Sequence, residues 1–483
     1  MDRKLIRNYL YNILYQVVKI ILPLLLVPYT SVHVGAETLG IYNFAGAIMN
    51  WFILFGILGV NTYGNRQIAK VRDNKEELNR TFFEVFLMQV CNMILATAAY
   101  FIYIQLTVKE NLFFYRLTGL TMLASMLDIT WFFYGVEDFK KASIRNIIVK
   151  CVGVGLIFLL VKTPADLWKY ILINVGAELL GQAIMFVQLK QYITFEKVSL
   201  KDAYRHHFKS TFQLFVPTIA ISVYTMLDKT MVGYLYSEEH VTYYLTSMNI
   251  VQMFLYFITS IGSVMLPRVT NVFYTSEDGD KKAQALISTT MKIACLLAFP
   301  MCFGMMAIAP NFISWYLPAW YPIIANLIMM GCPIIIFISM SNVTGIQYMV
   351  PTGMYQQYST SVIAGSLINF AVNIMLIPRY GAYGAVIGSL IAECSVTSIQ
   401  LYLIRRKVHL GFRNRSYLIY ACGALVMFAC VSGAGLYLPK NVLGTLVQVL
   451  IGVIVYAGII LVSREELAMK VISKVLKKGE ANA

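Results

Sequence analysis

Charged residues are scarce in this chain. Of its 483 residues, 13% are Asp, Glu, Lys or Arg and 58% are hydrophobic, whereas soluble domains usually carry about 25% charged residues. Its apolar runs are long enough to cross a bilayer, and a backbone in lipid must satisfy its own hydrogen bonds, so we expect these runs to be membrane helices. The short alternating segments of a membrane barrel are absent.

Several signatures of enzymes are also missing. The dipeptide Gly-Lys never occurs, so there is no P-loop for ATP. The histidines show no metalloprotease spacing, and no loop expected outside the cell is large enough for a catalytic domain. All eight cysteines fall in apolar runs without metal-ligand spacing, where they act as small apolar residues. We therefore expect no enzyme activity, cofactor, metal or disulfide, and a membrane glycosyltransferase is disfavoured.

The apolar runs predict an all-α polytopic membrane protein with about 14 transmembrane helices. The predicted spans are 10–34, 41–62, 82–106, 113–135, 146–162, 167–189, 211–236, 241–266, 284–309, 321–345, 358–378, 382–404, 416–438 and 441–462.

The basic residues predict the orientation of these helices. If the N-terminus is cytoplasmic, the outer loops hold only Lys109, Lys162, Arg379 and Lys440, and the other loop cations lie inside. This obeys the positive-inside rule and places both termini in the cytoplasm. The net charge of +15 is thus a sign of topology. Because its charges sit in short loops, we expect no nucleic-acid partner.

Weak internal symmetry predicts a repeat. When the sequence is shifted by 202 residues, the pairs Glu37 and Glu239, Tyr42 and Tyr244, and Arg66 and Arg268 coincide. Transporters are often built from such repeats. We predict six-helix bundles over 1–209 and 210–407, followed by helices 13–14 and an amphipathic cytoplasmic tail over 408–483.

Prolines lie inside corresponding helices of the two predicted halves. Pro23 and Pro28 fall in the first span and Pro217 in the seventh. A proline removes a helical hydrogen bond and bends the helix. These residues are candidates for gating, and static packing kinks are the alternative.

The remaining candidates are charges inside the spans, which are costly and usually face a cavity or a partner. Lys19, Lys229 and Lys292 are candidates for binding an anionic phosphate group of a substrate. Glu178, Glu393 and Asp228 are candidates for carrying a coupling cation, H⁺ or Na⁺; ion pairing between the acids and the lysines is the structural alternative. Residues near span ends, such as Glu84, can reach the interface and are more simply explained that way.

Four stretches of the sequence are distinctive as a set: residues 59–66 (GVNTYGNR), 128–140 (DITWFFYGVEDFK), 227–233 (LDKTMVG) and 265–268 (MLPR). Through these stretches the chain resembles Wzx-type polysaccharide-unit flippases of the MOP (multidrug/oligosaccharidyl-lipid/polysaccharide) exporter superfamily, which also holds MATE exporters and MurJ-type lipid II flippases. The four stretches contain Arg66, Asp128, Trp131 and Arg268, which the resemblance suggests as gating or folding residues.

The resemblance implies two six-helix bundles around a V-shaped central cavity. It implies ion-coupled alternating access that moves undecaprenyl-diphosphate-linked oligosaccharide from the inner to the outer leaflet of the bacterial plasma membrane, for capsule or exopolysaccharide synthesis. The expected partners are that lipid-linked glycan, membrane lipids and a polysaccharide polymerase. A lipid II-type flippase, a multidrug or cation exporter, and a non-transport scaffold of a polysaccharide assembly complex stay open as alternatives.

Overall fold

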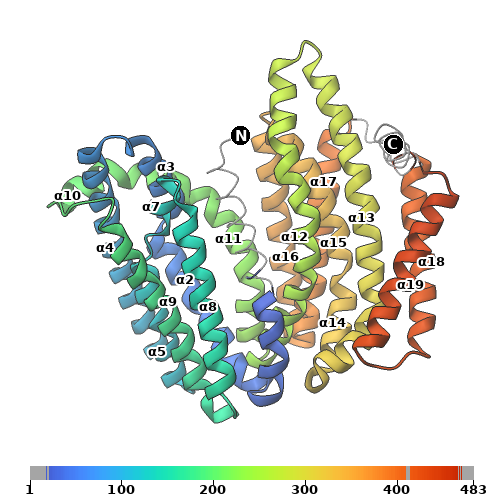
Figure 1. Cartoon of the computed structure of the whole chain (residues 1–483), viewed down its shortest axis with the longest axis horizontal. Coiled ribbons are helices and arrows are strands. Elements are labelled where there is room, and N and C mark those ends of the chain that lie inside the picture. The colour runs from blue at the N-terminus through green and yellow to red at the C-terminus, as the bar shows by residue number, and fades with distance from the viewer. Residues whose placement is uncertain (1–17, 19–20, 409–413, 466, 468, 470–483) are drawn as a thin grey trace, which may run out of the picture. The chain divides into compact units, whose positions relative to one another are not determined.

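The computed structural model describes residues 18, 21–408, 414–465, 467 and 469 (Figure 1). All regular elements in this part of the chain are helices, which confirms the predicted all-α class. Ten helical stretches within it are long and apolar enough to cross a membrane, and each matches a predicted span. The other four predicted spans, 10–34, 146–162, 211–236 and 241–266, fall on a helix over Ile21–His33 and on α8, α11 and α12.

The first helices after Ile21–His33 are α2 (Ala36–Ile57), α3 (Val60–Val71), α4 (Lys75–Thr107), α5 (Leu112–Gly119), α6 (Thr121–Met126), α7 (Thr130–Gly135), α8 (Phe139–Leu160), η1 (Pro164–Asp166), α9 (Leu167–Leu189), α10 (Leu200–Ala203), the π-helix η2 (Tyr204–Phe208) and α11 (Lys209–Leu235). They are followed by α12 (Glu238–Thr275), α13 (Gly279–Tyr316), η3 (Pro318–Trp320), α14 (Ile323–Gly331), α15 (Pro333–Ser341), the π-helix η4 (Asn342–Met349), α16 (Tyr355–Tyr380), α17 (Ala382–Ile404), α18 (Arg415–Gly435) and α19 (Val442–Val462).

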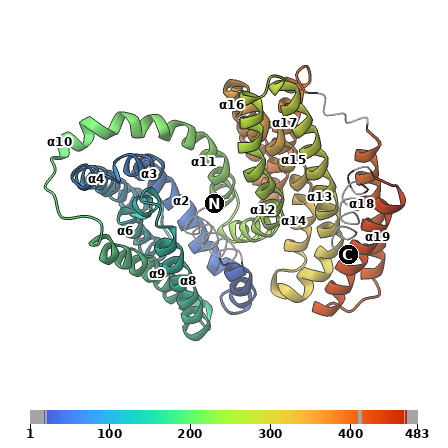
Figure 2. The same cartoon turned by 45° about the horizontal axis from the view of Figure 1, so that its top comes forward.

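The chain divides into two compact units, residues 1–242 and 243–483. In the first unit, α2 packs against α4, α5 and α11, α8 packs against α9, and α3 packs against α7. Figure 2 follows the run from α10 past α4 and α3 to α11. Helix α11 packs within the first unit, although the sequence symmetry suggested that it opens the second bundle. The predicted boundary at residue 209 marks the start of the second sequence repeat, whereas the two units are defined by how compactly they pack. The repeat boundary therefore stays a prediction.

In the second unit, α13 is the central helix and contacts α14, α15, α18 and α19 (Figures 1 and 2). Polar side chains tie α19 to α13 within apolar surroundings. The amide of Asn311 donates to Oε1 of Gln448 at 2.9 Å, and the indole of Trp315 donates to Oγ1 of Thr445 at 2.8 Å. Few competing polar partners exist in lipid, so such bonds fix the register of packed helices. The two C-terminal helices therefore belong to this unit.

The predicted span 113–135 is not one continuous helix. It consists of α5, α6 and α7, with breaks at Leu120 and at residues 127–129. No proline marks these breaks, so hydropathy alone could not locate them. Lys19 and most of the predicted amphipathic tail lie outside the described residues.

Candidate functional site

The motif residues of α3 and α7 pack together in one buried core in the first unit. The indole of Trp131 is 1% exposed and donates from Nε1 to Oε1 of Gln89 on α4 at 2.9 Å. Its ring lies over Gly64, where a Cβ atom would come within 2.5 Å of the indole Cε3. Phe82 also stacks on the Trp131 ring, with centroids 5.5 Å apart. The glycine of the first motif thus makes room for the tryptophan of the second.

Asp128 binds the first residue of α7. Its Oδ1 accepts hydrogen bonds from the backbone N of Thr130 at 2.9 Å and from the Thr130 hydroxyl at 2.5 Å. Its backbone carbonyl accepts a bond from the amide of Gln89 at 2.9 Å. Asp side chains commonly stabilise a turn in this way. These contacts support a folding role for Asp128 and leave its proposed part in gating untested.

The acidic residues at the end of the second motif reach neighbouring segments. Glu137 forms an ion pair with Arg72 after α3, with 2.7 Å between the oxygen and nitrogen atoms. The hydroxyl of Tyr192, which follows α9, donates to Oδ2 of Asp138 at 2.5 Å. The ion pair is exposed and adds little stability. The motif therefore connects the end of α7 to two other segments of the same unit.

The two arginines of the motifs are exposed. Arg66 lies on α3 and Arg268 on α12, and both side chains are exposed to the surroundings. Pro23 and Pro28 lie in the helix Ile21–His33, and Pro217 lies within α11, which continues through it as a helix. The gating roles suggested for these residues stay predictions.

The charged candidates within the spans differ in exposure. Asp228 on α11 is buried, with 5% exposure, and its neighbour Lys229 is half-buried. Adjacent residues on a helix point about 100° apart, so these two face different surroundings. Lys292 on α13 and Glu393 on α17 are both half-buried in the second unit.

Glu178 differs from these residues because its side chain is exposed on α9, within an apolar span. Its charged neighbours are Lys150 on α8 and Asp128. An edge-to-face pair of half-buried rings, Tyr42 and Tyr170, lies nearby with centroids 5.2 Å apart. The first unit thus brings a carboxylate, an amine and two phenol rings into one neighbourhood. The sequence identifies Glu178 as a candidate, but it does not identify its aromatic neighbours.

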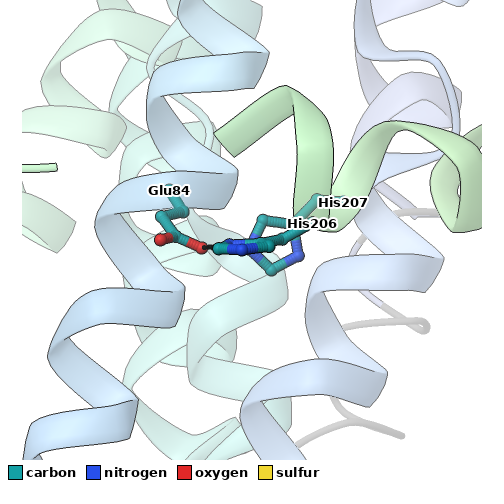
Figure 3. Close-up of side chains that lie close together, drawn as sticks. All are labelled: Glu84, His206 and His207. Carbon is teal, nitrogen blue, oxygen red and sulfur yellow. Dashed lines mark hydrogen bonds and ion pairs between the residues drawn. The ribbon is translucent and has the colours of Figure 1, made fainter. Parts of the chain in front are cut away.

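A second cluster joins α4 to η2 and was not predicted. Figure 3 shows the Glu84 carboxylate pointing toward the rings of His206 and His207. Its Oε2 lies 3.1 Å from Nδ1 of His206 and 2.8 Å from Nε2 of His207. The other oxygen accepts a 2.9 Å bond from Nε of Arg80. The Tyr63 hydroxyl of the first motif lies 2.7 Å from Nδ1 of His207.

Burial distinguishes the members of this cluster. The side chains of Glu84 and His207 are 4% and 9% exposed, and that of His206 is 43% exposed. Burial lowers the pKa of His207, although its bond to Glu84 acts in the opposite direction. The ring of His207 therefore favours the neutral form, which has one donor and one acceptor nitrogen. The cluster links the first motif, α4 and the segment that leads into α11.

Known proteins resemble this chain in sequence over most of its length. A model of the family described as "Polysaccharide biosynthesis protein" matches residues 5–273. A protein named "Putative O-antigen transporter" from Escherichia coli (strain K12) is 25% identical over 83% of this chain and 96% of its own length. A protein of the same name from Shigella dysenteriae is 22% identical over 79% of this chain and 96% of its own.

Solved structures agree in fold. A structure titled "Lipid II flippase MurJ, inward closed conformation" has a TM-score of 0.76 at 15% identity and covers 94% of this chain and 100% of its own. An inward-facing MATE multidrug transporter of the MOP superfamily has a TM-score of 0.53 at 13% identity and covers 80% and 98%. At such identities the likeness concerns the fold. The predicted resemblance is confirmed: this multi-pass membrane protein has the fold of the MOP superfamily and belongs to the polysaccharide biosynthesis protein family.

Proposed function

We propose that this protein is a flippase that moves undecaprenyl-diphosphate-linked oligosaccharide units from the inner to the outer leaflet of the plasma membrane. The observation that carries the proposal is the family match over residues 5–273, together with O-antigen transporter relatives that align over most of the chain. The role is transport and not catalysis. The exported glycan would enter capsule, exopolysaccharide or a related surface polymer, with a polysaccharide polymerase as the next partner.

Physical chemistry explains why such a substrate needs a protein. The hydroxyl groups of a glycan would lose their hydrogen bonds to water in hydrocarbon, at a cost of about 2–7 kcal/mol for each unsatisfied group. The lipid tail pays no such penalty and can stay in the bilayer. The protein must therefore supply polar partners for the head group alone. The neighbourhood of Glu178, Tyr42 and Tyr170 has this chemistry, since phenol rings pack on sugar faces and donate hydrogen bonds.

The driving force is proposed to be an ion gradient, because the sequence contains no ATP-binding motif. Glu178 and Glu393 lie on α9 and α17, which are equivalent helices in the predicted repeat. A carboxylate within a span is costly when charged, so binding H⁺ or Na⁺ would change its preferred surroundings. Asp228 is a further candidate for the same role.

The test uses purified protein in vesicles that contain the lipid-linked oligosaccharide, with an impermeant glycosidase outside to measure exposure of the glycan. Glu178→Gln and Glu393→Gln should each reduce the dependence of the rate on a pH or sodium gradient while expression stays normal. Wild-type rates in both variants across both gradients would make the carboxylates structural. A wild-type protein that moves no oligosaccharide, or moves lipid II equally well, would contradict the proposed substrate.

The diphosphate is proposed to bind the lysines of the spans. Lys19 and Lys292 are the first candidates, of which the structure describes Lys292, and Lys229 is a further candidate. A charge-assisted hydrogen bond contributes about 1.5–3 kcal/mol, so Lys292→Ala should weaken head-group binding about tenfold or more. Lys292→Arg should retain much of the binding because the charge persists. Equal transport by the wild type and Lys292→Ala over a range of substrate concentrations would exclude this contact.

A further inference from the structure

The Glu84, His206 and His207 side chains form a three-ligand cluster outside the proposed transport path residues. We propose that it binds one divalent transition-metal cation, with Zn²⁺ as the best-suited ion. The ligand atoms are Oε2 of Glu84, Nδ1 of His206 and Nε2 of His207, which all lie within 4.8 Å of one another (Figure 3). This inference goes beyond the proposed function and does not depend on it.

The geometry suits a cation because the contacts converge on one carboxylate oxygen. Both imidazole nitrogens contact Oε2, while Arg80 uses Oε1. A metal ion can replace the protons shared at Oε2 without displacing the guanidinium from the other oxygen. Bonds of about 2.0–2.2 Å to tetrahedral zinc put neighbouring ligands about 3.3 Å apart. The observed 2.8 and 3.1 Å therefore need to open by only a few tenths of an ångström.

The surroundings also resemble those of a metal ligand set. Metal-bound imidazoles usually hold a hydrogen bond through the second ring nitrogen. Nδ1 of His207 has such a partner in the Tyr63 hydroxyl, at 2.7 Å. The side chain of His206 is 43% exposed, so water can reach this ligand from solvent.

The type of ligand selects the class of ion. Two imidazoles and one carboxylate suit zinc and its neighbours among the transition metals, whereas magnesium and calcium prefer oxygen ligands alone. The ion would tie the π-helix η2, which leads into α11, to α4. Its role is then structural, because it fixes a connection between elements of the first unit, and no turnover step is assigned to it.

The test uses the full-length protein in detergent, with its purification tag removed and bound metals stripped by a chelator. Isothermal titration with Zn²⁺ should show one saturable site, and Zn²⁺ should raise the apparent Tm. His206→Gln should weaken binding at least tenfold and abolish the Tm rise. The matched control is His240→Gln on α12, which should bind Zn²⁺ as the wild type does. His206 is substituted first because its side chain is largely exposed, so the fold should tolerate glutamine at this position.

A second readout separates this cluster from the cysteines. Co²⁺ in place of Zn²⁺ should give the visible bands of a nitrogen- and oxygen-bound tetrahedral ion, and these bands should be lost in Glu84→Gln. Zn²⁺ binding at wild-type affinity in both His206→Gln and Glu84→Gln would overturn the proposal. A cobalt spectrum dominated by thiolate charge transfer would do the same, as would the absence of saturable Zn²⁺ binding by the wild type.

Discussion

Gly64→Ala tests how tightly the two motifs pack. The added Cβ atom would lie 2.5 Å from Cε3 and 2.7 Å from Cδ2 of Trp131. The indole cannot move away easily, because it is 1% exposed, bonded to Gln89 and stacked on Phe82. Either the ring shifts and weakens its hydrogen bond, or α3 moves away from α7. Both responses destabilise the first unit.

The expected change in the free energy of unfolding of Gly64→Ala is the sum of two opposing effects. Replacing glycine by alanine in a helix normally stabilises it by about 1 kcal/mol. Overpacking a core costs about 1–3 kcal/mol, and weakening the bond from Trp131 to Gln89 costs roughly 1 kcal/mol more. The cost exceeds the gain, so we expect a net destabilisation of about 1–3 kcal/mol. In a unit of this size that lowers the apparent Tm by roughly 2–10 °C.

The measurement is thermal unfolding of the detergent-solubilised protein at one fixed heating rate. The matched control is Gly155→Ala on α8, where a Cβ atom would meet nothing within 4 Å; this variant should be neutral or slightly stabilised. In a Trp131→Leu background, Gly64→Ala should cost less, because the ring that it meets is gone. If Gly64→Ala raised the Tm as Gly155→Ala does, the close packing of the two motifs would be refuted.

Two further predictions concern topology and pH. In a background without native cysteines, an impermeant thiol reagent added outside cells should modify Cys at position 238 (Glu238→Cys) and spare it at position 201 (Lys201→Cys); the opposite pattern would contradict the predicted orientation. Burial lowers the pKa of His207, so the unfolded chain, whose imidazole titrates near about 6.5, takes up the proton first. In chelator, the apparent Tm should therefore fall as the pH drops below about 6.5. His207→Gln should flatten that fall, and an equal fall in both proteins would exclude His207 as its source.

The sequence could predict the helices because lipid imposes a simple rule on long apolar runs. Each predicted span overlaps a helix, and Gly64 and Trp131, which pack together, both lie in motifs that the sequence alone identifies. The breaks within α5–α7 could not be predicted, since they follow from turn contacts such as that of Asp128 with Thr130. Helix α12 extends to Thr275, beyond the predicted end at residue 266. The prediction ended the span where the sequence becomes polar, but the helix continues into that polar segment.

The cluster of Glu84 with His206 and His207 was missed for a different reason. Its carboxylate lies 122 and 123 residues from the two imidazoles, so no local spacing could reveal it. The π-helix brings both histidines toward one oxygen, because its wider turn reduces the angle between consecutive side chains. The only signal in the sequence was the adjacent pair His206 and His207 in a short predicted loop. Two adjacent histidines do not by themselves indicate a metal site.

Packing separates the charged residues of the first unit into two kinds. Asp128 and Glu84 have hydrogen-bonded partners that hold secondary structure in place, so their charges are compensated locally. Glu178 is exposed on an apolar span, and its charged neighbour Lys150 is exposed as well. A charge at such a position is stable only beside water, a lipid head group, a bound ion or an opposite charge such as that of Lys150. A transporter must offer polar and charged groups to its substrate or its coupling ion within the membrane. Glu178 is therefore the stronger candidate for a transport role. Asp128 is the stronger candidate for a role in folding.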